Sequence, residues 1–65
     1  MSAREAYREK LERARTMLAT LSRLLDEHER DHMEQPDGWG FVGDLGAVND
    51  HLGQAAAALE VTERA

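Results

Sequence analysis

Apolar residues recur along the first half of the chain in steps of three and four, which places their side chains on one face of an α-helix. The series runs through Tyr7, Leu11, Ala14, Leu18, Leu21, Leu25, His28 and His32. Its steps alternate strictly between four and three, which is typical of a heptad seam that packs against another helix. Met17 and Leu24 each precede a seam leucine and widen the seam to the stripe that a bundle helix needs. The pattern predicts a helix over about residues 3–34.

Local signals predict where this first helix begins and ends. Ser2 and Glu5 form a capping box, in which the serine side chain accepts a hydrogen bond from the glutamate amide, so a helix should begin directly after Ser2. Neither glycine nor proline occurs in residues 1–35, and Pro36 pushes the residue before it out of the α region. We therefore expect the helix to end near Glu34.

The second half of the chain repeats the heptad spacing after a glycine-rich segment. The apolar series there runs through Phe41, Leu45, Val48, Leu52, Ala55, Leu59 and Thr62. It predicts a second helix over about residues 42–62. The segment 36–44 contains the only proline and the turn pair Asp37-Gly38, which marks a bend. With either Asp37 or Gly43 as the N-cap, Asp44 should lie near the positive end of the helix dipole.

The bend also carries the only tryptophan and the only phenylalanine of the chain. We expect Trp39 and Phe41 to close the end of a hydrophobic core, because Phe41 continues the second seam. The alternative is that Trp39 anchors a partner protein, since tryptophan is enriched at binding hot spots.

The two seams predict an all-α fold, an antiparallel two-helix hairpin that occupies residues 1–65 as a single domain. The second helix has a further stripe of small residues, formed by Gly46, Asn49, Gly53 and Ala56. Glycine inside a helix costs about 1 kcal/mol relative to alanine, and we interpret the stripe as a place where another backbone approaches closely. One hairpin cannot cover both stripes and the flank of Met17 and Leu24. We therefore expect a homodimer that forms a four-helix bundle, or an uncovered face that binds a different protein.

Composition and charge narrow the function further. The net charge is −5, and residues 31–65 hold seven acidic side chains but a single arginine. An acidic chain is a poor general nucleic-acid binder, which normally shows a basic patch. There is no cysteine, so disulfides and thiolate metal sites are excluded. No apolar run approaches the roughly 20 residues that span a membrane, and we expect a cytoplasmic protein without a membrane segment.

Two short motifs resemble known sites. His28-Glu29-Arg30-Asp31-His32 matches His-Glu-x-x-His and resembles the zinc metallopeptidase signature over five residues, but a third histidine is missing at the usual distance. The candidate metal ligands are His28, His32, His51 and Asp44, and the ordinary interpretation places both first histidines in the seam. Residues 38–43 match Gly-x-Gly-x-x-Gly, yet a helix precedes them where a dinucleotide site needs a strand. We expect no cofactor and no bound metal.

Three functions compete on this basis. The first is a non-enzymatic interaction or assembly module that acts through its helix faces, in one variant as an acidic inhibitor of a larger protein. The expected architecture also resembles the plasmid-encoded Rop family of paired RNA-binding hairpins, although no sequence motif is shared. That likeness is one of shape and does not carry the function over. The second function is an RNA- or DNA-binding dimer, because pairing would double the density of basic residues on the first helix, which are Arg4, Arg8, Lys10, Arg13, Arg15 and Arg23. The third function is metal binding by the histidines.

Overall fold

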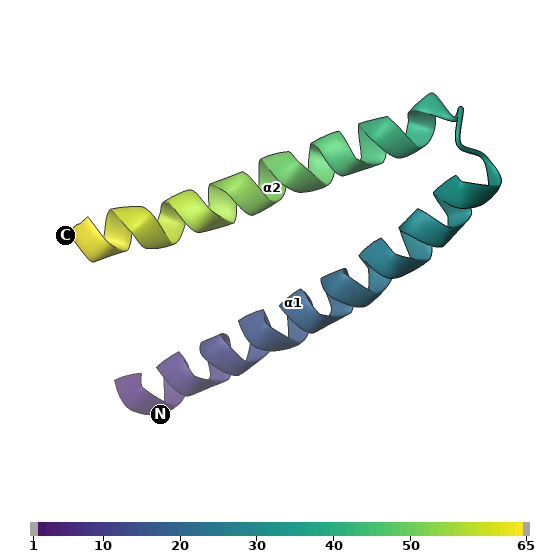
Figure 1. Cartoon of the computed structure of the whole chain (residues 1–65). Helices are drawn as coiled ribbons and strands as arrows, with labels where there is room; N and C mark the ends of the chain where they lie inside the picture. The colour runs from purple at the N-terminus through teal and green to yellow at the C-terminus, as the bar shows by residue number, and fades with distance from the viewer. Residues whose placement is uncertain (1, 65) are drawn as a thin grey trace. The chain divides into compact units, whose positions relative to one another are not determined.

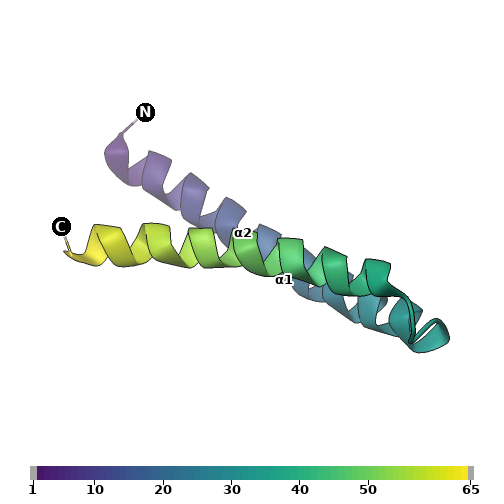
Figure 2. The same cartoon turned by 90° about the horizontal axis from the view of Figure 1, so that it is seen from above.

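The computed structural model describes the backbone of residues 2–64 and the side chains of residues 2–60. Two α-helices account for most of this range, and no strand occurs within it (Figures 1 and 2). The chain divides into one unit that ends at Glu34 and a second that begins at Gln35, each with a single helix. The predicted all-α class with two helices is confirmed.

Helix α1 spans Ala3–Glu34, a length of 32 residues. At its start, Oγ of Ser2 accepts a hydrogen bond from the Glu5 amide at 3.2 Å, and the Ser2 carbonyl accepts one from the Ala6 amide at 3.0 Å. The first bond satisfies one of the amides that a helix start leaves without a partner, and the second is the first backbone bond of the helix itself. The helix ends two residues before Pro36. Both predicted ends of the first helix are therefore confirmed.

The connection between the helices is a tight turn closed by a hydrogen bond from the Gly38 amide to the Gln35 carbonyl, 3.1 Å long. Space for a side chain at position 38 is tight. A Cβ there would lie 3.0 Å from Cδ2 of Phe41 and 3.3 Å from the carbonyl oxygen of Gln35. No glycine among residues 2–64 adopts a positive φ, so the left-handed region does not explain its use here.

Helix α2 spans Trp39–Arg64, a length of 26 residues. It begins earlier than the predicted start near residue 42, because Gly40 and Gly43 adopt ordinary helical backbone angles instead of extending the turn. Gly38, rather than Asp37 or Gly43, directly precedes the helix. The first turn of α2 holds no acidic residue, so the expected place of Asp44 near the positive end of the dipole was wrong. The helix also continues past the predicted end at Thr62.

Candidate interaction surfaces

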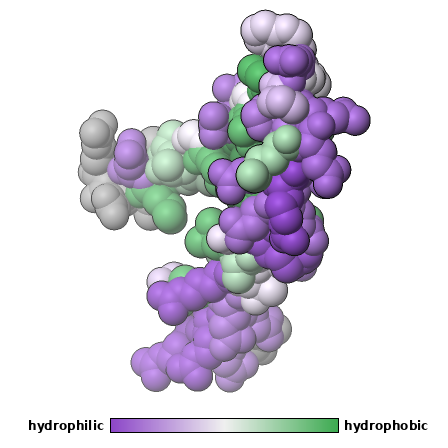
Figure 3. Space-filling model, turned by 45° about the vertical axis from the view of Figure 1, so that its right-hand side comes forward, coloured by the Kyte–Doolittle hydropathy of each residue, from purple (hydrophilic) through white to green (hydrophobic). Residues whose placement is uncertain are grey.

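Large apolar side chains lie open to solvent along both helices. No side chain among residues 2–60 is fully buried, and the described part of the chain contains no hydrophobic core of its own. Figure 3 shows hydrophobic atoms, in green, at the surface beside the hydrophilic atoms in purple. Burying apolar surface is the main favourable term in folding and association. These faces are therefore the candidate functional surfaces of the chain.

The seam of α1 is more clearly defined than the apolar face of α2. Leu11, Leu21 and Leu25 are half-buried, whereas Leu18, on the same face, is 60% exposed. Tyr7 at the start of the seam is also largely exposed. The helix therefore presents a continuous apolar stripe that another helix can cover.

Met17 and Leu24 lie on the predicted flank of this seam and are 60% and 47% exposed. They belong to a longer row at seven-residue spacing, which Lys10 begins and Asp31 ends. Residues seven apart lie nearly above one another on a helix, with a drift of about 20° per heptad. We call Lys10, Met17, Leu24 and Asp31 the flank row. Met17 and Leu24 are the predicted apolar members of this row, and the same seven-residue spacing adds its charged ends.

The small-residue stripe of α2 is exposed at all four of its positions, Gly46, Asn49, Gly53 and Ala56. A Cβ added at Gly46 or at Gly53 would meet nothing within 4 Å. The packing of the chain itself therefore does not require glycine at either position. The face is open and carries small side chains, so a second helix can approach it closely.

The two aromatic residues at the start of α2 differ in exposure. Trp39 is 82% exposed in the single chain, and its expected place at the end of a core stays a prediction for the assembled protein. It is the first residue of α2, and with Pro36, Asp37, Gly38 and Val42 it lines a surface depression of about 260 Å³. Phe41 is half-buried, and its ring occupies the space that a side chain at Gly38 would need. Trp39 is left as a surface aromatic residue available to a partner.

Each helix carries two of the four candidate metal ligands. His28 and His32 are half-buried one turn apart on α1, while Asp44 and His51 are exposed on α2. Within the described residues, no group of three His, Asp or Glu side chains is placed to hold a metal ion.

The Gly-x-Gly-x-x-Gly match lies across the start of α2 and is preceded by the turn after α1, not by a strand.

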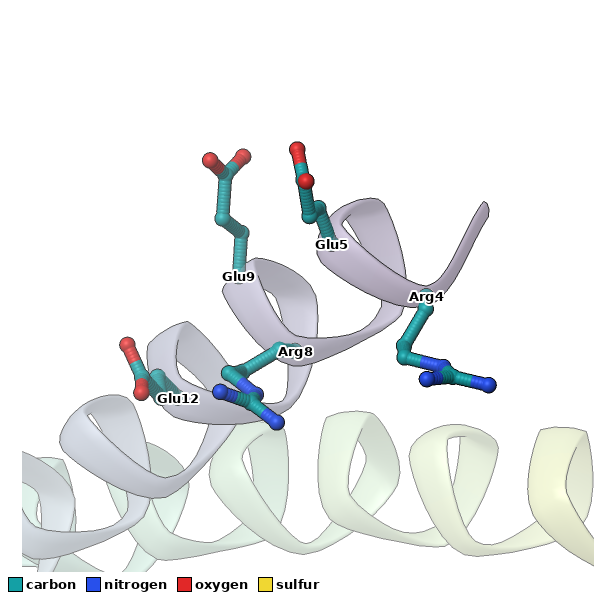
Figure 4. A pocket seen from close by; sticks show the side chains of 5 residues that line it. All are labelled: Arg4, Glu5, Arg8, Glu9 and Glu12. Carbon is teal, nitrogen blue, oxygen red and sulfur yellow. The ribbon is translucent and has the colours of Figure 1, made fainter. Parts of the chain in front are cut away.

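The basic residues of α1 do not form one continuous face. At about 100° per residue, Arg4, Arg8 and Arg15 lie within roughly 40° of one another around the helix, whereas Lys10 and Arg13 lie on other sides. A shallow depression of about 270 Å³ at this end is lined by Arg4, Arg8 and three glutamates, Glu5, Glu9 and Glu12. Figure 4 shows Glu5 and Glu9 pointing to one side of α1 and Arg4 and Arg8 to the other. Further along α1, Arg23 pairs with Glu27 at 3.3 Å.

Known proteins add no functional assignment to these surfaces. No protein-family model, curated protein or solved structure matches the chain. In the part of the chain that the structure describes, neither helix is long and apolar enough to cross a membrane.

Proposed function

We propose that this protein is a non-enzymatic assembly module, a two-helix antiparallel hairpin that pairs with a second copy into a four-helix bundle. The observation that carries the proposal is the exposure of large apolar side chains at heptad spacing, with Leu18 at 60%. Fully burying one such side chain contributes about 1.5–3 kcal/mol relative to leaving it in water. Several leucines on each helix therefore supply a strong drive for association.

A homodimer explains why both the apolar faces of α1 and the small-residue stripe of α2 are exposed in the single chain. A helix in a four-helix bundle packs its seam into the core and touches a neighbour on each flank. The seam and flank row of α1 fit this geometry, because each holds exposed apolar side chains. The stripe of Gly46 and Gly53 fits it too, because its open space lets another helix approach closely. Closed symmetric dimers are the commonest oligomers of soluble proteins.

Trp39 is the residue we assign to contact with a different protein. It is 82% exposed beside a surface depression, at the connection between the helices. Tryptophan provides a large contact area and is enriched among residues that dominate binding energy. The acidic balance of residues 31–65 favours a partner with a basic surface, which this chain would inhibit by covering that surface.

The test is the solution mass of the full chain, measured by light scattering behind a sizing column over a dilution series. We expect a stable mass of twice 7.3 kDa. A folded monomer at every concentration, with a cooperative thermal transition, would contradict self-assembly and direct the search to a protein that covers the apolar faces.

A further inference from the structure

The flank row of α1 is complementary to itself when read in the opposite direction. From the start of the helix it reads lysine, methionine, leucine, aspartate at seven-residue spacing, over Lys10, Met17, Leu24 and Asp31. Reversing one copy places each lysine opposite an aspartate and each methionine opposite a leucine. In a parallel pair, lysine would instead face lysine and aspartate would face aspartate, and like charges across an interface are unfavourable.

The seam of α1 is also complementary to itself when one copy is reversed. Its steps of four, three, four, three, four, three, four read identically from either end. A reversed second copy therefore meets the seam in register at every layer. Leu18 lies opposite Leu21 of the second copy at the centre, Ala14 opposite Leu25, and Leu11 opposite His28. This small-with-large pairing of Ala14 suits close packing in a helical core.

We propose that α1 lies antiparallel beside α1 of the second copy, with the two flank rows in contact. Lys10 then faces Asp31 of the second copy, and Met17 faces Leu24 of the second copy. This proposal rests on the proposed self-assembly and adds its orientation and register. The occupant is a second copy because the row supplies both partners of each pair, charged at its ends and apolar in the middle.

The opposite flank of the seam is the competing contact surface. It carries Arg8, Arg15, Ser22 and Glu29, so its outer pair is also oppositely charged when reversed. Its centre, however, is an arginine opposite a serine. The flank row buries two apolar side chains that are 60% and 47% exposed in the single chain. Burial of Met17 and Leu24 therefore selects the flank row over this surface.

Disulfide trapping tests the register directly, because the natural chain has no cysteine. Full-length Met17→Cys and Leu24→Cys variants are mixed, oxidised and resolved by mass spectrometry. We expect the mixed disulfide to predominate. Two cysteines at position 17 would be displaced by about 10 Å along an antiparallel pair, which exceeds the reach of a disulfide. A Thr16→Cys variant on the outer face is the matched control and should not cross-link with Leu24→Cys.

Charge reversal gives an independent measurement. Lys10→Glu places two like-charge contacts in each dimer, and we expect its dissociation constant to rise about tenfold at low salt. The double variant Lys10→Glu/Asp31→Lys restores both pairs and should return within about twofold of the natural protein. Arg30→Glu on the outer face makes the same change in net charge and should have little effect.

The outcomes separate this proposal from the proposed function. Two results would overturn the register while leaving self-assembly intact. One is a stable dimer in which Met17→Cys forms mainly homodisulfides. The other is a stable dimer that is trapped instead by a disulfide between Arg8→Cys and Glu29→Cys. If the dissociation constant of Lys10→Glu/Asp31→Lys did not return toward that of the natural protein, the proposed register would also be contradicted. A chain that stays monomeric would overturn both.

Discussion

Helix α1 and helix α2 specify their packing faces by different means. Fifteen of the 32 residues of α1 are charged, and the apolar seam stands out against them. Only five of the 26 residues of α2 are charged, and much of the rest is glycine or alanine. The face of α1 is therefore marked by polarity, whereas the faces of α2 differ mainly in the size of their side chains.

This contrast has a consequence for stability. Four glycines lie inside α2, and each costs about 1 kcal/mol in helix propensity relative to alanine. No glycine lies inside α1, whose start is also capped by Ser2. Helices gain most of their stability from packing. We therefore expect α2 to depend more strongly than α1 on a neighbouring helix.

The largest expected effect comes from a charge in either seam. Leu18→Asp in α1 and Leu52→Asp in α2 should each unfold the assembled protein, because burying an unpaired carboxylate costs several kcal/mol. Circular dichroism and solution mass should show loss of helix and of dimer together. Thr16→Asp and Gln54→Asp, off the seams of the same helices, are the controls and should remain helical dimers. If Leu52→Asp alone were tolerated, the seam of α2 would not be a packing face.

A smaller effect is expected from side-chain size on α2. Gly53→Leu improves helix propensity, and apart from the adjoining backbone of α2 itself no described atom lies within 4 Å of the new Cβ. If another helix covers the small-residue stripe, the leucine must push it away, since overpacking costs about 1–3 kcal/mol. We therefore expect a lower melting temperature and a shift of the mass from dimer toward monomer.

Gly43→Leu is the matched control for this experiment. Gly43 also has open space around it, and it lies on the side of α2 away from the seam. The same gain in propensity should there stabilise the protein slightly. Equal behaviour of the two leucine variants would show that the stripe of Gly46 and Gly53 is not an interface.

The two helices also differ in how much of them the sequence could predict. Ser2 and Pro36 give α1 unambiguous ends, and both were confirmed. The start of α2 was placed too late because glycine-rich segments usually form turns, whereas Gly40 and Gly43 are helical here. Once the helix is known to begin at Trp39, that residue lies two positions, or about 200°, from Phe41 and therefore off the seam. The orientation of paired helices depends on interfaces that the single chain does not contain.

The smallest expected effect concerns the start of α2. Gly38→Ala would place a Cβ 3.0 Å from the Phe41 ring and 3.3 Å from the Gln35 carbonyl oxygen. The ring must give way, and the carbonyl accepts the hydrogen bond that closes the turn. We expect a loss of about 1 kcal/mol in the free energy of unfolding, measured by urea denaturation at fixed protein concentration.

Gly40→Ala is the comparison for that substitution, because a Cβ there meets nothing within 4 Å. It should leave stability unchanged or raise it by up to about 1 kcal/mol through better helix propensity. If Gly38→Ala lowers the free energy of unfolding and Gly40→Ala does not, then space beside Phe41, rather than backbone freedom, explains glycine at position 38. A gain at both positions would mean that the ring moves at no cost and that this turn is maintained by its hydrogen bond and Pro36 alone.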